Sequence, residues 1–445
     1  MVVEKANKPA VVLCAEGFED NVLSAARSRG MPGFRFVSET VPSECSVQEK
    51  IEAGITEKVI DDIVKELTRP LTEEEKSPAR PNLPQSPRIV SRGDIQEINR
   101  SFYESGWTDG MPIIPPTDAL VADMLTGTDL PADHEVAELI PRLGKATVEK
   151  IAINAVMAGA LPTHLPLIIA GVQILADPMS RFGLYAFSMG SWSPFWIVNG
   201  PVRHDVNVYG GQGALSPGRI ANAALGRSLA LIAKNIGGVR QGLEDMGVHG
   251  NPMKYSMVTG ENEEESPWEP LHVTRGFGKE DSTITMFYPN SYVDVLVYTP
   301  DAKGILNTAI YNIPPARGGI LCMLIPPKLA QFLADEGWSK KDIKGFIKEY
   351  TRCTPDKHWY HTIPGITKEE FIPFLPFSPT DMMPLITGDD QIEVVVSGKH
   401  TGYIGLTMGC WHIFDTFVTK KVEFPANWTK LVAKYKDMVP HYAEY

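Results

Sequence analysis

The sequence has few cysteines, and they are too far apart to suggest a disulfide framework. Five occur in 445 residues, none of them in a CxxC pair: Cys14, Cys45, Cys322, Cys353 and Cys410. Neither a disulfide-stapled secreted domain nor a four-cysteine zinc site is indicated. We therefore expect a protein of the reducing cytoplasm.

Long hydrophobic runs are also missing. A membrane-spanning helix needs roughly 20 consecutive apolar residues, and even the apolar stretch from Leu165 to Leu175 is broken by Gly171 and Gln173. The early apolar run, residues 10–13, is too short for the core of a signal peptide. We expect neither a membrane span nor a secretory leader.

Positive charge is not in excess. The 54 acidic residues outnumber the 42 lysines and arginines, which gives a net charge of -12. Because nucleic-acid binding needs a basic face, nucleic acid is not expected as the main partner. No GxxxxGK[ST] loop occurs and no clear GxGxxG follows a predicted strand, so a standard nucleotide-binding signature is missing.

Proline and glycine, by contrast, are abundant, with 36 and 38 residues. Many stand beside apolar or aromatic residues, as in GMPIIPP and FIPFLPFSP. They shorten helices and require many ordered loops. Because enzymes place functional residues on loops of a rigid scaffold, this composition favours an enzyme.

Residues 9–75 are predicted to form a small α/β unit. Its strands are PAVVLC and FRFVSETV, and its helices span residues 20–29 and 55–67. The strand–helix–strand order predicts a parallel pair with a right-handed crossover. Since two strands do not make a stable sheet alone, we expect this unit to dock onto the rest of the chain or onto another subunit.

Residues 76–93, rich in proline and charge, are predicted to be a linker. They separate the small unit, residues 1–75, from a large mixed α/β domain, residues 94–445. That domain shows no fixed repeat, so its strand order is not predicted. Its helices are expected at 94–105, 118–125, 146–159, 165–176, 327–336 and 339–350, and its strands at 283–287, 293–298, 319–325 and 391–397.

The stretch that most resembles a ligand site lies at residues 197–250. A strand-like run leads through a glycine-rich loop, residues 199–218, into a helix that begins near Pro217 and ends at Gly237. Glycines allow a ligand to approach the backbone, and a helix N-terminus offers free N–H groups to an anion. The alternative is a loop that merely turns. The predicted substrate-binding residues here are Gly210, Gly211, Arg219 and Asn222.

Two histidines flank this loop. His204 and His249 are candidate general acids or bases, because imidazole titrates near neutral pH. Asp205 follows His204 directly, but neighbours in sequence seldom contact each other's side chains, so the pair is a weak signal. The acidic run of residues 263–265 is expected to be solvated.

Polar and aromatic groups in apolar surroundings extend the predicted site. Trp107 and Asp109 lie in GWTDG, and Tyr255 follows the glycine-rich stretch. We predict that they contribute to substrate binding. Because buried polar groups need partners, they alternatively brace loops.

Two cysteines are candidate catalytic thiols. Cys14 ends a predicted strand before a helix, and a helix N-terminus lowers the pKa of a thiol. Cys410 lies two residues before His412, so in a strand their side chains share a face and can form a nucleophile–base pair or bind a metal. The alternative for both is a buried core cysteine.

A divalent metal, zinc or iron, is the candidate cofactor. His358 and His361 have HxxH spacing, which puts both rings on one side of a helix, and His412 is the third candidate ligand. Pro355 and Pro364 confine any helix here to about two turns, and no HExxH motif occurs. Two structural histidines are the alternative.

Several motifs carry a family resemblance. PAVVLCAEGFEDNVLSAARSRGMPGFRFVSETVP and the following EKIEAGITEKVIDDIVKELTRPLTEEE resemble the later half of the UGSC-type domain of (seleno)proteins. GWTDGMPIIPPT, EKIAINAVMAGALPTHLPLIIA, IVNGP, RIANAALGRSLALIAKNIGG and ESPWEPLHVTRGF are similar to the region fused to that domain in longer members. The U/C-G-S-C motif of the family is not found, since no GSC triplet occurs.

More distantly, the small unit is similar to glycine and proline reductase subunits, which cleave carbon–heteroatom bonds reductively and consist of several polypeptides. The resemblance implies a cytoplasmic enzyme subunit, an oxidoreductase or lyase, that acts on such a bond of a small molecule. It also implies a smaller partner subunit that supplies the redox motif. The alternatives are a metal-dependent hydrolase or lyase, and a non-catalytic assembly subunit.

Overall fold

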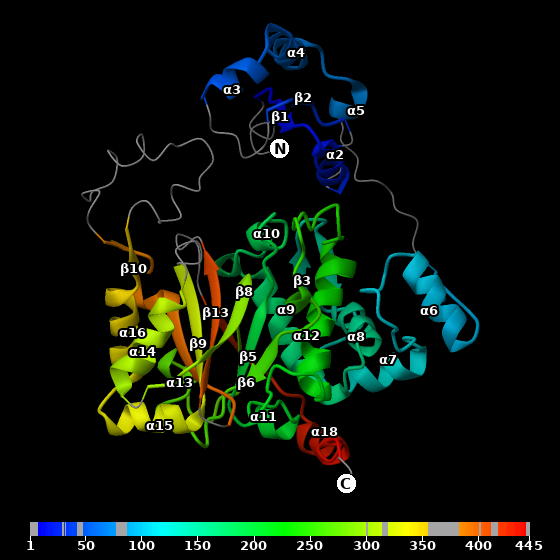
Figure 1. Ribbon diagram of the computed structural model, residues 1–445. Helices are drawn as coiled ribbons and strands as arrows, with labels where there is room; N and C mark the ends of the chain where they lie inside the picture. The colour runs from blue at the N-terminus through cyan, green and yellow to red at the C-terminus, as the bar shows by residue number, and fades with distance from the viewer. Residues whose placement is uncertain are drawn as a thin grey trace. The chain divides into compact units, whose positions relative to one another are not determined.

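The computed structural model describes residues 8–28, 31, 33–41, 48–76, 87–299, 301–313, 319–354, 382–399, 402–410 and 417–441. The chain divides into two compact units (Figure 1). The N-terminal unit comprises Met1–Val90 with Pro141–Leu143 and Cys353–Met383. The large unit comprises Ser91–Ile140, Gly144–Arg352 and Pro384–Tyr445.

The N-terminal unit is built on two parallel strands. β1 (Val12–Ala15) pairs with β2 (Phe36–Glu39), as the strand–helix–strand order predicts. Thr56 is the N-cap of α4 (Glu57–Thr68), and its side chain accepts a hydrogen bond from the backbone N–H of Val59. The helices of this unit are α2 (Glu19–Ser28), α3 (Gln48–Gly54), α4 (Glu57–Thr68) and α5 (Glu73–Lys76).

The large unit contains two four-stranded sheets, which we call sheet A and sheet B. Sheet A has the order β14-β7-β5-β6 and sheet B the order β12-β9-β13-β8. The strands of sheet A are β5 (Phe195–Asn199), β6 (Val258–Gly260), β7 (Thr283–Phe287) and β14 (Val418–Lys421). Those of sheet B are β8 (Ser291–Leu296), β9 (Gly319–Ile325), β12 (Ile392–Val396) and β13 (Tyr403–Cys410).

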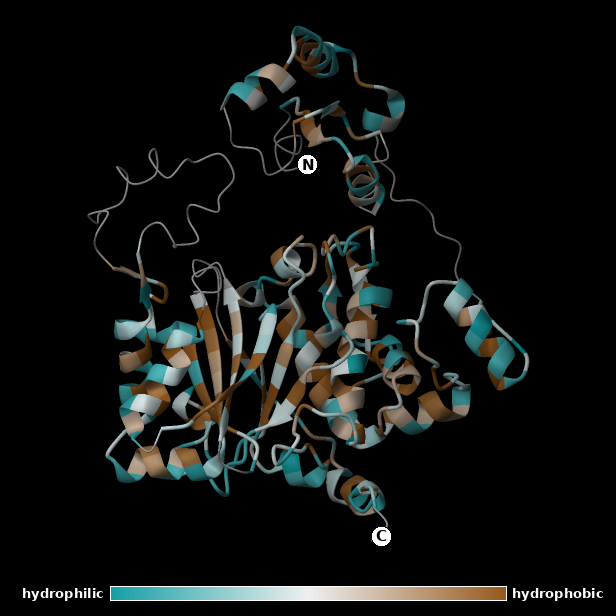
Figure 2. Cartoon of the chain, viewed as in Figure 1, coloured by the Kyte–Doolittle hydropathy of each residue, from teal (hydrophilic) through white to brown (hydrophobic). Residues whose placement is uncertain are grey.

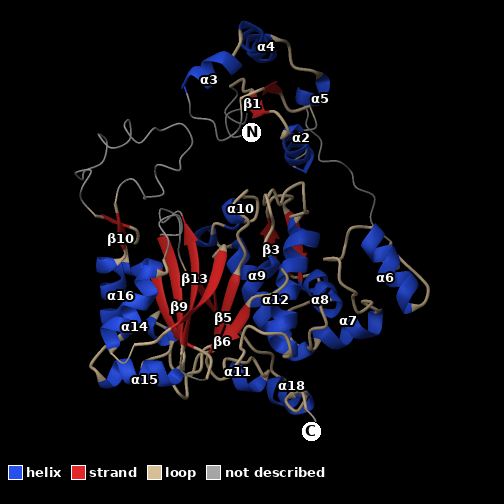
Figure 3. Ribbon diagram, viewed as in Figure 1, coloured by secondary structure: helices blue, strands red, loops and turns tan. Residues whose placement is uncertain are grey.

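Helices lie on both sides of the strands (Figure 3). On sheet A pack α9 (Leu165–Ala176) and α12 (Ile220–Ile232), with α8 (Val148–Met157) against them. On sheet B pack α14 (Ala302–Tyr311) and α16 (Lys340–Tyr350). The large unit therefore has four layers: helices, sheet A, sheet B and helices.

Shorter and peripheral elements complete the described part of the large unit. They are α6 (Ile95–Glu104), α7 (Asp118–Leu125), β3 (Glu135–Leu139), β4 (Gly144–Thr147), η1 (Pro162–His164), η2 (Pro178–Ser180), α10 (Phe182–Tyr185), α11 (Val202–Asp205), the π-helical turn η3 (Ala233–Gly237), η4 (Pro252–Lys254), α13 (Leu271–Thr274), α15 (Pro327–Asp335), η9 (Asp389–Gln391) and α18 (Trp428–Tyr435). Strands β10 (Arg352–Cys353) and β11 (Met383–Pro384) form a separate pair.

The two sheets repeat one arrangement. Read as β6-β5-β7-β14 and β12-β9-β13-β8, each sheet has one parallel pair followed by two antiparallel pairs. With α15 and the short elements left aside, the order along the chain also repeats: α9-β5-α12-β6-β7-β8, then α14-β9-α16-β12-β13-β14. Each half places its last strand at the edge of the other half's sheet. The sequence shows no fixed repeat because this repeat lies in the topology and not in the residue pattern.

The first core lies between the sheets. Phe195 and Ile197 of β5 pack with Phe287 of β7 against Ile320 and Leu324 of β9. Strands point successive side chains to opposite faces, so the residues between these face the helices. Figure 2 shows the apolar residues, in brown, concentrated on the strands and on the helices beside them.

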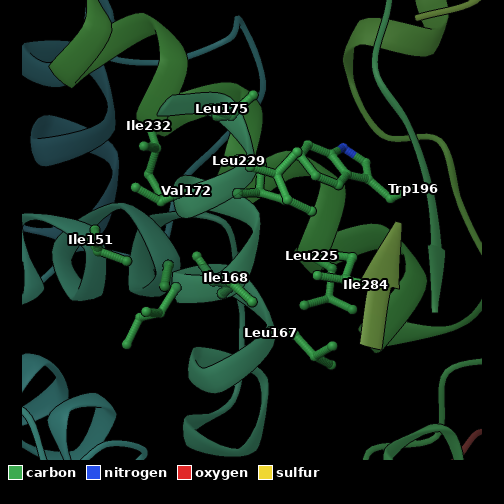
Figure 4. Close-up of a cluster of buried hydrophobic side chains, with 14 of the residues drawn as sticks. Ile151, Leu167, Ile168, Val172, Leu175, Trp196, Leu225, Leu229, Ile232 and Ile284 are labelled. Carbon is green, nitrogen blue, oxygen red and sulfur yellow. The ribbon is translucent and has the colours of Figure 1, made fainter. Parts of the chain in front are cut away.

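The second core lies between sheet A and its helices. Trp196 of β5 and Ile284 of β7 turn toward Leu225 and Leu229 of α12, and Ile168 of α9 lies in the same cluster (Figure 4). All these side chains are almost fully buried. The apolar periodicity that predicts α9 and α12 therefore marks the faces that hold this core.

The mixed α/β class is confirmed, and so are most predicted elements. The bounds of α7, α9, β7 and β9 agree with the predicted ranges, whereas β6, β13, β14, α14 and the β3–β4 hairpin are not predicted from the sequence. Among the described residues, no single helix has the length and apolar character to cross a membrane. One bent pair, Pro162–Ala176 with Pro178–Tyr185 at 75°, meets that test on length and composition alone.

Leu229→Ala tests the second core. Leu229 is 1% exposed, and its removal leaves a cavity that we expect to cost about 2–5 kcal/mol of unfolding free energy. Leu120→Ala on α7, where the side chain is 42% exposed, should change that energy by only about 0.5 kcal/mol. Urea unfolding of the full chain measures both, and equal effects would contradict this packing.

Candidate functional site

Polar residues gather where the parallel strands of both sheets end. Asn199 ends β5, Glu261 follows β6, and Ser397 follows β12. The backbone N–H of Asn262 donates to Val396 O at 2.8 Å, and the hydroxyls of Thr259 and Ser397 lie 3.2 Å apart. The carboxyl ends of β6 and β12 therefore meet. This is where open α/β sheets place ligands, and we call the residues around it the strand-end cluster.

Glu261 is the most buried charge of the strand-end cluster, with an exposed fraction of 0%. Lys340 of α16 forms an ion pair with its Oε1 at 2.9 Å. Asn199 Nδ2 and the backbone N–H of Leu271 donate to its Oε2 at 2.7 and 2.6 Å. This carboxylate thus has a partner on each oxygen, and it links the end of β6 in one half to α16 in the other.

A second carboxylate fixes the turn after β5. Glu263 Oε1 accepts hydrogen bonds from Gly200 N at 2.7 Å and from Asn199 Nδ2 at 3.0 Å. Gly200 has a φ of 82°, and an added Cβ would lie 2.1 Å from Asp281 O. Only glycine fits both that backbone conformation and that space. The expectation that the run 263–265 is solvated is therefore wrong for Glu263, which is 13% exposed.

Arg203 of α11 joins the parts of the strand-end cluster. Its guanidinium donates to Glu261 O at 2.7 Å and to both oxygens of Glu264 at 2.9 and 3.1 Å. A fork of this kind holds a carboxylate in one orientation. Arg203 is 6% exposed, so a buried cation holds the carboxylate of Glu264.

Glu264 in turn holds His204. Their Oε1 and Nε2 atoms lie 2.8 Å apart, and both side chains are more than half exposed. Hydrogen bonds from Arg203 overcome the effect of burial and lower the pKa of Glu264 to about 2. An ionised Glu264 holds the imidazole in one orientation. Of the two predicted acid–base histidines, His204 therefore has the geometry for proton transfer.

Two buried polar atoms of the cluster have no hydrogen-bond partner among the described residues: Asn199 Oδ1 and His272 Nδ1. His272 on α13 is 0% exposed, and its Nδ1 lies 3.9 Å from Glu263 Oε1. His272 and Lys340 were not predicted as site residues, because neither belongs to a motif with a periodic or spacing signal. Glu261 had no clearer signal, since it follows the three-residue strand β6, which is not predicted from the sequence.

The glycine-rich loop packs against these strand ends. Gly210 O accepts from Gly398 N at 2.8 Å, and a Cβ on Gly210 would lie 2.3 Å from Gly260 O. Asn222 donates to the carbonyls of Tyr209 and Val258 at 2.9 and 3.0 Å. In this structure Gly210 and Asn222 thus serve the close packing of the loop against β6.

Gly211 and Arg219 lie at the same loop. A Cβ on Gly211 would lie 2.7 Å from the hydroxyl of Tyr209. Arg219 is the N-cap of α12, and its guanidinium lies over the Tyr209 ring at 4.5 Å. Arg219 therefore places a cation at the N-terminus of α12, where an anion was predicted to bind.

Trp107 and Asp109 belong to a braced loop beside α12. Arg227 donates to both oxygens of Asp109 at 2.8 and 2.9 Å. Burial alone would raise the pKa of Asp109, but the contact with Arg227 lowers it below the usual value. Asn235 donates to Trp107 O at 2.9 Å and Lys234 to Thr108 O. These contacts match the bracing alternative.

His249 lies in the loop between η3 and η4, Tyr255 directly follows η4, and both are exposed. Tyr255 is 47% exposed. Within the described ranges, no side-chain hydrogen bond joins either residue to the strand-end cluster.

The candidate thiols occupy different surroundings. Cys14 of β1 is 3% exposed, and burial raises its pKa, with Glu19 and Glu39 adding to the effect. The expected lowering by a helix N-terminus is therefore wrong. Cys322 and Cys353 are buried too. Cys410 ends β13, but its side chain lies outside the described part of the structure, as do His358, His361 and His412. In the described part, no group of three His, Cys, Asp or Glu residues is placed to hold a metal.

Glu264 should make stability depend on pH. Its folded pKa of about 2 lies below the ordinary value of 4.5, so its contribution is present above about pH 4.5 and is lost as the pH falls toward 2. Glu264→Gln should therefore flatten the decline of stability over that range in urea unfolding. Glu269→Gln, at an exposed position nearby, should keep the wild-type slope. A wild-type slope in Glu264→Gln would contradict the contact with Arg203.

Comparison with known proteins identifies no relative of this chain. No family model, no curated protein and no solved structure matches it. The resemblance to UGSC-type proteins stays an expectation from sequence motifs, and function is inferred from the site itself.

Proposed function

We propose that the chain is a cytoplasmic enzyme subunit that cleaves a carbon–heteroatom bond of a small molecule, with His204 as the proton-transfer group. The observation that carries this proposal is the chain of contacts from buried Arg203 through Glu264 to exposed His204. A carboxylate that orients an imidazole is the usual support of a histidine acid or base. His204 also lies where α/β sheets bind ligands.

We propose further that the thiol or selenol of the reaction comes from a partner subunit. Cys14, Cys322 and Cys353 are the cysteines whose side chains are described, and all three are buried. A buried thiol with a raised pKa is a poor nucleophile at neutral pH. The open two-stranded sheet of the N-terminal unit is consistent with this arrangement, because two strands need further packing to be stable.

The proposed reaction balances as a reductive cleavage. The partner's selenol and thiol give up two electrons and two protons and end as a selenium–sulfur bond. The carbon gains a hydrogen, and the heteroatom leaves with the other proton. His204 delivers that proton to the leaving atom and is protonated again from the partner's thiol.

His204→Gln tests the role of the histidine. The complex purified gently from its own host is incubated with the host's small-molecule extract, and mass spectrometry follows the compound consumed. Because general acid catalysis contributes about 10²–10⁴-fold, His204→Gln should slow consumption about a hundredfold or more while the partner stays bound. His134→Gln, at another exposed histidine, should act like wild type.

Native mass spectrometry of the same preparation tests whether a partner subunit is bound. We expect a second, smaller polypeptide that carries a selenocysteine or a cysteine motif. Full activity of this chain without any partner would contradict the split site. Unchanged turnover in His204→Gln would instead favour the alternative of a non-catalytic assembly subunit. Bound metal in the preparation would favour a metal site at His358, His361 and His412.

A further inference from the structure

The C-terminal helix α18 lies against the short helix α11, which carries His204 (Figure 1). Trp428, the first residue of α18, donates a hydrogen bond from its Nε1 to Asp205 Oδ2 at 2.9 Å. Asn207 donates from its Nδ2 to the carbonyl of Lys436, at the other end of α18, at 2.7 Å. Both ends of α18 therefore hold residues that closely follow His204.

The helix α11 needs such contacts because it has only four residues, Val202–Asp205. A helix this short is not stable by itself in water. Two residues after its end, Asn207 has a φ of 58°, in the left-handed region that residues other than glycine seldom adopt. The position of α11 therefore depends on contacts with the rest of the large unit.

His204 has a fixed neighbour on each side. Arg203, before it, is buried, and its guanidinium holds Glu264. Asp205, after it, is half-buried and bound to Trp428. Because successive side chains of a helix point about 100° apart, these two contacts fix the rotation of α11 about its axis. They thereby fix the side from which His204 reaches Glu264.

The helix α18 is itself held to another part of the large unit. Asp123 of α7 accepts hydrogen bonds from Lys434 Nζ at 3.1 Å and from the hydroxyl of Tyr435 at 2.8 Å. Just before α18, the backbone N–H of Ala426 donates to Asp129 Oδ2 at 2.8 Å. The helix α18 thus connects α7 and the loop after it to α11, and it can act as a firm support.

We propose that α18 positions His204, and that Trp428 does so through its hydrogen bond to Asp205. Trp428 is then a positioning residue, since it acts on the imidazole through α11. Without this bond α11 turns, and His204 loses its contact of 2.8 Å with Glu264. The inference rests on the role proposed for His204, but the position of the imidazole can be measured without any turnover.

Diethyl pyrocarbonate, which acylates accessible imidazole nitrogens, measures how firmly Glu264 holds His204 in the purified full chain. Peptide mass spectrometry gives the rate at each histidine, and the exposed His134 is the internal reference. Glu264→Ala gives the rate of a released imidazole. Trp428→Phe keeps an aromatic ring and removes the N–H donor, so it should raise the rate at His204 several-fold, toward that of Glu264→Ala.

Matched variants separate this contact from a general loss of packing. Asp205→Leu removes the acceptor and should act like Trp428→Phe, whereas Asp205→Asn keeps an acceptor oxygen and should restore the wild-type rate. Tyr435→Phe removes a hydrogen bond at the other end of α18. It should leave the rate at His204 unchanged, because the bond from Trp428 remains.

Turnover of the compound that the complex consumes gives a second readout. Misplacing a catalytic group by about 1 Å can cost about a hundredfold in rate, so Trp428→Phe should lower kcat about tenfold or more with little change in KM. Changed acylation with unchanged turnover would support the positioning and contradict the proposed role of His204. Two results would overturn the inference: acylation of His204 in Trp428→Phe at the wild-type rate, or an equal increase in Tyr435→Phe.

Discussion

The strand-end cluster depends on the buried ion pair between Glu261 and Lys340. Removing a carboxylate and an ammonium from water is costly, and the cost is offset only when both groups are well partnered. Here Glu261 also accepts from Asn199 and from the backbone of Leu271. The pair joins β6 of one half to α16 of the other, so it fixes the meeting point of two sheets that share one topology.

The position of the exposed His204 depends on these buried residues. Arg203 contacts the backbone carbonyl of Glu261 with the same guanidinium that holds Glu264. Glu264 then orients His204. The exposed side chain of a histidine on this short helix would otherwise rotate freely, and catalysis needs it in one place. Proton transfer, as we propose it, therefore depends on residues that never touch the substrate.

The sequence predicts the layers better than the site. Local signals predict these elements correctly: the apolar periodicity of α9 and α12, and the buried runs of β7 and β9. The signals are reliable because each element buries the face that its pattern marks. The topological repeat could not be predicted, since β14 is short, has three polar residues out of four and pairs with a strand far away in sequence. Among the site residues, His204 lies on the short helix α11 and not in the expected loop, and Glu261 obtains its burial from partners as distant in sequence as Lys340. The prediction of a lowered pKa for Cys14 was wrong for the same reason. Burial raises this pKa, and the neighbours of Cys14 in sequence do not reveal that burial.

A double-mutant cycle on Glu261 and Lys340 tests most directly whether this pair supports the site. Removing one partner of a buried ion pair leaves an uncompensated charge and typically costs about 3–5 kcal/mol. We expect Glu261→Gln and Lys340→Met each to lose stability of that order in urea unfolding, and the double variant to lose clearly less than their sum. Additive losses, or single losses of only about 0.5 kcal/mol, would show that the halves are held together by the apolar core alone.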